Sequence, residues 1–145
     1  MTRAEFEALR DCPDKRIEAD IRFVEQRPTR PLRIAEDLRV SNPDGVDLRL
    51  TITYNPLTGS KSVNVHVPGV GPVCRLEADS RLHPPAGRSH KQALVTEDCP
   101  RRNLPDEVGD RPALDGSSVE RLFRVFCKMA NITHVGSFCS PDEGR

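Results

Sequence analysis

The stretch that decides the fold is VDLRLTITYNPLTG, residues 46–59. In its first nine residues, apolar side chains alternate with polar ones, which is the period of a β-strand with one buried face. The apolar positions are Val46, Leu48, Leu50, Ile52 and Tyr54. The NPLTG segment that follows is a five-residue hairpin loop with glycine at its end. This strand and its turn predict an antiparallel sheet with one apolar face and one polar face.

Similar alternating segments lie on both sides of this strand and extend the predicted sheet. They cover residues 17–23, 32–40, 63–67, 74–78 and 90–96. No connection between them is long enough to hold a crossover helix, so neighbouring strands are expected to pair antiparallel. The result is a predicted meander of about six strands.

Two helices are predicted from capping signals. TRAE, residues 2–5, is a capping box that starts a short helix through about Arg10, and SSVE, residues 117–120, is a second one. The second box opens an apolar stripe at helical spacing, formed by Val119, Leu122, Phe123, Phe126, Met129 and Ile132. Because a one-sided sheet needs an apolar helix to cover it, this stripe is interpreted as core rather than as a groove for a cofactor or partner.

The predicted fold class is therefore α+β. We expect an antiparallel sheet of about six strands, covered on one face by the helix of residues 117–132 and flanked by the short N-terminal helix. Residues 1–139 are expected to form a single domain, with a surface loop over residues 97–115 and a flexible tail over residues 140–145.

Composition limits the function classes. The 145 residues hold 22 basic and 22 acidic side chains, so no overall field recruits nucleic acid or an anionic membrane. No apolar run approaches the roughly 20 residues of a membrane span. Five cysteines without a Cys-x-x-Cys pair predict free thiols in a reducing compartment, and hence a cytoplasmic protein. We expect no cofactor, and no metal, since histidines seven positions apart match no closed zinc pattern.

One loop concentrates groups suited to acid–base chemistry. RLHPPAGRSHK, residues 81–91, holds His83 and His90, and residues 75–91 carry four basic side chains against two acids. Histidine exchanges protons near neutrality, and arginine or lysine stabilises charge on a phosphoryl group. The candidate catalytic residues are therefore His83 and His90. The candidate phosphate-binding residues are Arg81, Arg88 and Lys91.

The alternative interpretation of this loop stays open. Both histidines can be solvated loop residues, or one can cap the turn. Hairpin pairing of residues 74–79 with residues 91–96 predicts that the rings of His83 and His90 lie within about 12 Å of each other, as two groups sharing one phosphate must. His66, on the polar face of a strand, and His134, after the last helix, are predicted to be structural.

RLEADSRLHPPAGRSH, residues 75–90, resembles the signature of a little-characterised family of small bacterial proteins. That family is itself similar to the TumE-like toxins of toxin–antitoxin modules. The resemblance extends to the closing helix, which ends in FCKMANI, residues 126–132. It implies a strand ending in Asp79, a His-Pro-Gly turn and a His-x-His strand. Gln92 stands where the second histidine of that strand is expected, and glutamine cannot carry a proton.

Two functions from different classes follow. The first is a metal-independent ribonuclease toxin built on His83 and His90. The second is a non-catalytic protein-binding module, such as an inhibitor, an antitoxin or a component of phage defence, with residues 97–115 as its contact. The basic balance of residues 75–91 favours the first, and Gln92 favours the second. Either function implies a protein partner, the first also implies RNA, and neither implies a membrane.

Overall fold

The computed structural model describes residues 2–26, 31–79, 90–91 and 112–141. The helical elements are α1 (Arg3–Asp11), a 3₁₀ turn η2 (Pro112–Leu114) and α2 (Val119–Met129). The strands are β1 (Lys15–Ile17), β2 (Val24–Glu25), β3 (Arg33–Val40), β4 (Leu48–Tyr54), β5 (Lys61–Val67), β6 (Gly71–Ala78), β7 (His90–Lys91) and β8 (Ile132–His134).

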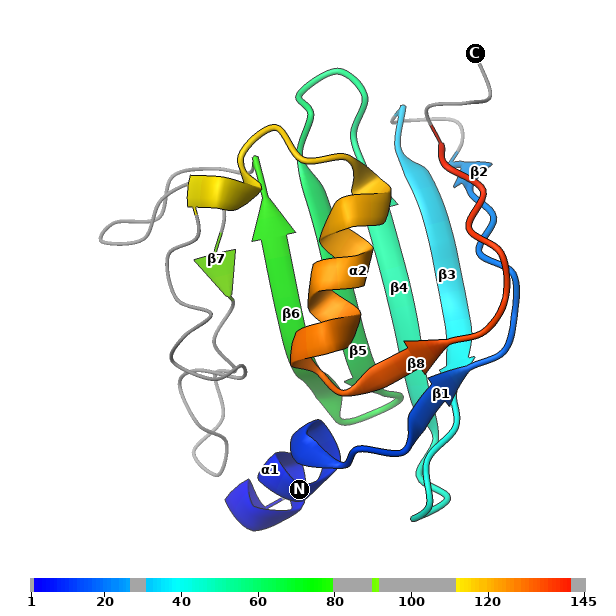
Figure 1. Cartoon of the computed structure of the whole chain (residues 1–145), viewed down its shortest axis with the longest axis vertical. Helices are drawn as coiled ribbons and strands as arrows, with labels where there is room; N and C mark the ends of the chain where they lie inside the picture. Colours follow the sequence, from blue (N-terminus) through cyan, green and yellow to red (C-terminus); the bar gives the residue numbers. More distant parts are fainter. Residues whose placement is uncertain (1, 27–30, 80–89, 92–111, 142–145) are drawn as a thin grey trace.

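Six of these strands form one antiparallel sheet in the order β2-β3-β4-β5-β6-β7, which confirms the α+β class (Figure 1). Four strands are long, and the edge strands β2 and β7 have two residues each. The predicted hairpin is confirmed: the amide of Asn55 donates to the carbonyl of Ser60 at 2.9 Å, and Gly59 has a φ of 78°. A positive φ at this position is what the glycine permits.

Helix α2 covers one face of the sheet and lies over β5 and β6 (Figure 1). Its apolar stripe is core, as predicted, because the side chains facing the sheet are fully buried. These are Val119, Leu122, Phe123 and Phe126. They pack in one cluster with the alternating apolar residues of β4 and β5. Leu114 joins the same cluster at 1 % exposure, so the end of the predicted surface loop is part of the core.

The N-terminal cap of α2 lies one residue later than predicted. Ser118, and not Ser117, is the cap, and its hydroxyl accepts a hydrogen bond from the amide of Arg121 at 3.1 Å. Glu120 therefore falls in the first turn of the helix, where it forms an ion pair with Arg124 at 3.3 Å instead of completing a capping box. Ser117 is instead buried, and its hydroxyl accepts a hydrogen bond from Nη1 of Arg121 at 3.1 Å.

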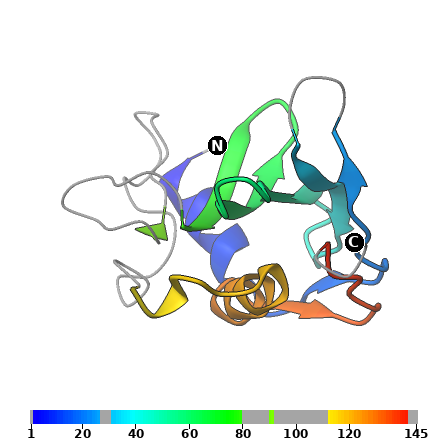
Figure 2. The same ribbon diagram turned by 90° about the horizontal axis from the view of Figure 1, so that it is seen from above.

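The prediction for residues 17–23 is wrong: they do not form the first strand of the sheet. Instead β1 pairs in parallel with β8 in a separate two-stranded ribbon, with Ile17 opposite His134. An isolated bridge between Ile21 and Phe138 continues this pairing. The ribbon runs across the sheet on the side of α2 (Figures 1 and 2). Ile17 and Ile21 are fully buried there, so the same alternation of apolar residues serves a second layer instead of the sheet.

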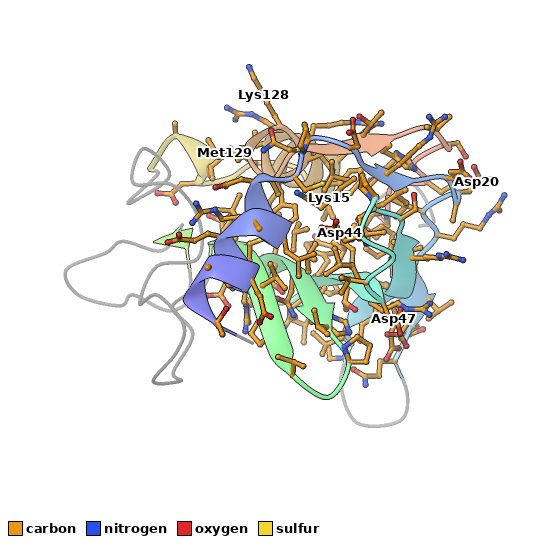
Figure 3. The ribbon with its side chains drawn as sticks, turned by 90° about the horizontal axis from the view of Figure 1, so that it is seen from below. Lys15, Asp20, Asp44, Asp47, Lys128 and Met129 are labelled. Atoms are coloured by element: carbon orange, nitrogen blue, oxygen red, sulfur yellow. The ribbon has the colours of Figure 1, made fainter. Side chains whose placement is uncertain are left out.

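A buried lysine forms hydrogen bonds with the C-terminal end of helix α1. Lys15 is 2 % exposed, and its Nζ donates to the carbonyls of Leu9 at 2.9 Å, Arg10 at 2.6 Å and Cys12 at 2.7 Å. These carbonyls belong to the end of the helix, where no backbone donor follows. Burial lowers the pKa of Lys15. Figure 3 shows Lys15 inside the molecule beside α1, whereas Lys128 projects outward from α2.

Replacing Lys15 by Met is expected to lower the free energy of unfolding by about 2 kcal/mol, because buried carbonyls lose their donor. Urea unfolding followed by circular dichroism measures the change. Lys128→Met is the matched control on an exposed side chain, and its effect is expected to stay within about 0.5 kcal/mol. Equal stabilities of the two variants would show that Lys15 does not stabilise the end of α1.

The cysteines of the described residues are free, as predicted. Cys12 and Cys139 are half-buried, whereas Cys74 and Cys127 are buried. Burial raises the pKa of both buried thiols to about 12. Because the thiolate is the reactive form, these two cysteines are chemically inert core residues near neutral pH. Cys99 lies outside the described residues.

Candidate functional site

The loop of residues 81–91, which the sequence predicts to hold the site, lies mostly outside the described residues. His83, Arg81 and Arg88 are not described, so the predicted distance between the rings of His83 and His90 stays a prediction. The backbones of His90 and Lys91 are described as β7, which pairs with β6 at the sheet edge. The register places His90 directly opposite Glu77 and Lys91 opposite Leu76.

The face of the sheet that points away from α2 carries polar side chains in rows across the strands. Alternation along β4, β5 and β6 sends every second residue to this face, and in Figure 2 α2 and β8 both lie on the other side of the sheet. We call it the open face. Its first row is Thr53, Ser62 and Glu77; the second is Thr51, Asn64 and Arg75; the third is Arg39, Arg49 and His66.

A pocket of about 210 Å³ opens at the first row of the open face. Its lining residues are Leu32, Thr53, Asn55, Ser60, Lys61, Ser62, Arg75 and Glu77. Pockets that enclose a whole small-molecule ligand usually measure about 300–1,000 Å³. This pocket is therefore suited to one group of a larger polar ligand, such as a single phosphate or a sugar hydroxyl.

The chemical groups in the pocket suit acid–base work on an anionic ligand. Glu77 is 7 % exposed, and its Oε1 lies 2.5 Å from Nη2 of Arg75. The hydroxyls of Thr53 and Ser62 share a hydrogen bond of 2.6 Å beside them. A carboxylate can accept a proton, and a guanidinium can bind phosphoryl oxygens. The pocket thus combines a base, a fixed cation and hydroxyl groups within one row and its neighbour.

An ion pair at the end of β6 involves Lys61, which lines the pocket but lies by alternation on the α2 side of β5. Lys61 is 8 % exposed, and its Nζ donates to Oδ2 of Asp79 at 2.7 Å and to the carbonyl of Gly59 at 2.8 Å. Both carboxylate oxygens of Asp79 also accept from the amide of Gly116 at 3.0 Å. We call Lys61, Asp79 and Gly116 the Asp79 clasp. It ties the start of β5 and the end of β6 to the segment that leads into α2.

The third row of the open face lies between two irregularities of the sheet. One β-bulge interrupts β3 between Ala35 and Leu38 and includes Asp37, which has a φ of 54°. The other shifts the pairing of β5 and β6 between Val65 and His66. Such bulges re-aim side chains and are over-represented next to functional sites. Here they adjoin His66, whose Nε2 lies 3.8 Å from Oδ1 of Asp37.

Two acceptor or donor atoms near this row are buried without a hydrogen-bond partner in the described part of the chain. They are Oδ1 of Asn64 and Nδ1 of His66. Buried polar atoms of this kind are few in folded proteins and call for an explanation, such as an ordered water or a functional role. His66 was interpreted from the sequence as a structural residue, and nothing in its contacts assigns it a strong structural bond.

Distance decides which histidine can work with Glu77. His66 follows the register partner of Glu77, Ser62, by four residues, which is about 13 Å along a strand. An acid and a base that share one phosphate must each reach it by a hydrogen bond, so His66 is too far away. His90 is the direct partner of Glu77, and paired residues have Cα atoms about 4.5–5.5 Å apart.

His134 is structural, as predicted, although its partners differ from the helix carbonyls that were expected. Its Nε2 donates to the carbonyl of Ala19 at 2.9 Å, and its Nδ1 accepts from Nη1 of Arg124 at 3.4 Å. The ring also packs edge-on against Phe123, with 5.3 Å between centroids. His134 therefore joins β8 to α2 and to the segment after β1.

Comparisons with known proteins place the chain in no family. No family model matches it, and no curated protein or solved structure matches it significantly. The resemblance to TumE-like toxins therefore stays a prediction. None of the helices within the described ranges is both long and apolar enough to cross a membrane. Within those ranges, no group of three His, Cys, Asp or Glu side chains is placed to hold a metal ion.

The sequence indicated the part of this site at the sheet edge, but it did not indicate the pocket. It drew attention to His90 and to the acids of the preceding strand, because they lie close together along the chain. It did not indicate the pocket, which Thr53 and Ser62 line from β4 and β5. The available signal was the polar half of the alternation in residues 46–67, since polar residues on an uncovered sheet face are candidates for binding.

Proposed function

We propose that the protein is a small ribonuclease whose site is the pocket of the open face. Glu77 acts as the base, His90 as the acid, and Arg75 binds the phosphate. The observation that carries this proposal is the Glu77–Arg75 ion pair in the pocket, with the backbone of His90 directly opposite Glu77. His83, which the sequence predicts to be catalytic, lies outside the described residues, and we assign the base to Glu77 because it lies opposite His90 in the sheet.

The chemistry proceeds without an added co-reactant. Glu77 takes the proton of a ribose 2′-hydroxyl, and that oxygen attacks the adjacent phosphorus. The bond from phosphorus to the 5′-oxygen breaks, and the 5′-oxygen receives a proton from His90. Arg75 stabilises the negative charge that builds up on the phosphoryl oxygens. The products are a 2′,3′-cyclic phosphate and a 5′-hydroxyl. Arg81, Arg88 and Lys91 stay proposed as further phosphate contacts.

In the cell, this activity suits the toxin of a toxin–antitoxin module or a phage-defence system, as the resemblance of residues 75–90 and 126–132 implies. Such a role requires a protein partner that blocks the enzyme until it is needed. The small pocket supports a polymeric substrate, since it accepts one group and leaves the rest of the ligand on the open face.

The experiment that tests the proposal is expression in bacterial cells, scored for growth arrest and for RNA decay. Wild type is compared with His90→Ala and with His134→Ala, a histidine with structural contacts only. Purified proteins are incubated with single-stranded RNA, and a 2′,3′-cyclic phosphate product is the expected result for wild type. Abolished cleavage in His90→Ala alone supports the site. Intact RNA with folded wild-type protein overturns the proposal.

A second candidate function is the non-catalytic protein-binding module. The observation that favours it is the short contact between Arg75 and Glu77, because a guanidinium that already binds a carboxylate is less available to a substrate phosphate. Gln92 favours the same function. In that case the mixed charges of the open face serve a protein surface. The protein then causes no RNA decay, and substitutions at Glu77 alter binding to a co-purified partner instead.

A further inference from the structure

The third row of the open face contains an unfavourable arrangement of charge. Arg39 of β3 lies directly opposite Arg49 of β4, and His66 of β5 lies opposite Arg49 on its other side. Like charges directly opposite each other destabilise an antiparallel pair. Among the described residues, α2 and β8 both lie on the other side of the sheet, so the side chains of this pair are not packed against these two elements. Binding of an anion between the two guanidinium groups would offset their repulsion.

The neighbouring acidic residues orient Arg49, but they do not use all the guanidinium donors of this row. Nε of Arg49 lies 2.7 Å from Oδ1 of Asp47, and its Nη1 donates to the carbonyl of Asp37 at 3.5 Å. Nη2 of Arg49 has no partner within the described residues. Arg39 is exposed and forms no ion pair within the same residues. The row therefore offers guanidinium groups to a ligand, one of them held in place by a carboxylate.

The row and the pocket lie on one line across the open face. Arg75 lines the pocket on the side nearer the third row, since its register partner Asn64 precedes His66 by two residues on β5. The first and third rows are four residues apart, which is about 13 Å along a strand. A phosphate at the third row is therefore a different phosphate from the one in the pocket.

The three rows favour a backbone ligand over stacked bases. None of their side chains is Phe, Tyr or Trp, whereas proteins that bind single strands by stacking present such rings to successive bases. Contacts to phosphates need only cations at intervals along a groove or face, which the arginines supply.

We propose that Arg39, Arg49 and His66 form a second phosphate subsite, which holds a single-stranded RNA beyond the phosphate in the pocket. The identity of the substrate rests on the proposed ribonuclease function. The subsite itself adds affinity and sets the direction of the bound RNA. The RNA runs from the pocket, past Arg75, to the end of the sheet where Arg39 lies opposite Arg49.

The test measures the salt dependence of binding. A fluorescent single-stranded oligonucleotide with 2′-O-methyl groups cannot be cleaved, and its binding is followed by anisotropy between low and moderate salt. Each phosphate contact on a single strand contributes about 0.7 to the slope of log K against log salt. Arg39→Gln with Arg49→Gln is expected to make the slope shallower by about 1.4 and to weaken binding roughly tenfold at low salt.

Lys128→Gln is the matched control, because it removes one positive charge on the side of α2. Figure 3 shows Lys128 and Asp47, the ion-pair partner of Arg49, on opposite sides of the molecule. The control is expected to leave the slope unchanged. The double arginine variant is expected to be at least as stable as wild type, since the repulsion between the two guanidinium groups is gone. Weaker binding by a protein of unreduced stability excludes an effect through misfolding.

Each outcome decides between the two proposals. An unchanged slope in the double variant overturns the second subsite, while RNA cleavage by wild type would still support the pocket. Binding that depends on Arg39 and Arg49 in a protein that cleaves no RNA supports the subsite and overturns the ribonuclease. Absence of any oligonucleotide binding by wild type overturns the subsite. Displacement of the oligonucleotide from wild type and from the double variant by equal concentrations of inorganic phosphate also overturns it.

Discussion

Replacing Glu77 by Gln is expected to lower kcat for RNA cleavage by about 10²–10⁴-fold, the usual contribution of a positioned acid or base. Glutamine keeps the size of the side chain and a hydrogen bond to Arg75, but it cannot take the proton of the 2′-hydroxyl. Because Arg75 still binds the phosphate, KM is expected to change little. A loss in kcat without a matching rise in KM is typical of an interaction made in the transition state.

The measurement is steady-state cleavage of a short fluorescent RNA by purified protein. Glu36→Gln, which alters an exposed carboxylate of β3, is the matched control and is expected to retain full activity. Unfolding curves of both variants show whether the buried position of Glu77 alters folding. If the Glu77→Gln protein cleaves RNA at the wild-type rate, Glu77 is not the base.

Replacing Asp79 by Ala is expected to lower the free energy of unfolding by about 3 kcal/mol. The loss leaves the ammonium of Lys61, 8 % exposed, without its carboxylate, and breaking one side of a buried ion pair typically costs about 3–5 kcal/mol. The amide of Gly116 loses its acceptor as well. Asp79→Asn is expected to cost less, because asparagine retains an acceptor and tolerates the positive φ of this position.

Two controls separate the contributions to this loss. Asp37 has the same φ of 54° as Asp79, but its side chain is 67 % exposed and, among the described residues, contacts only His66 at 3.8 Å, so Asp37→Ala measures mainly the backbone strain. Lys61→Met combined with Asp79→Ala removes both charges, and the double variant is expected to be more stable than Asp79→Ala. Urea unfolding gives all the values. Equal losses for Asp37→Ala and Asp79→Ala would show that the clasp contributes nothing beyond backbone strain.

The Asp79 clasp also shows which contacts near the site could be predicted from the sequence. The sequence predicts Asp79 as the last residue of a strand, one residue past the observed end of β6, and His90 as the first residue of the next one, because both signals are local. Lys61 and Gly116 join Asp79 from positions 18 and 37 residues away in the chain. Alternation along residues 46–67 indicated which side chains share a face, but it did not indicate which of them line a pocket with Glu77.

The sequence by itself determined the elements whose pattern repeats over a few residues: the hairpin of β4 and β5, the buried stripe of α2 and the capping box of α1. These follow from local backbone geometry, in which side chains recur every two residues along a strand and every 3.6 along a helix. Only the tertiary structure decided that β1 pairs with β8 and not with the sheet. It also placed Arg39 beside Arg49 and Glu77 beside His90. Such partners depend on which distant segments bury the same core, and no local period of the chain contains that information.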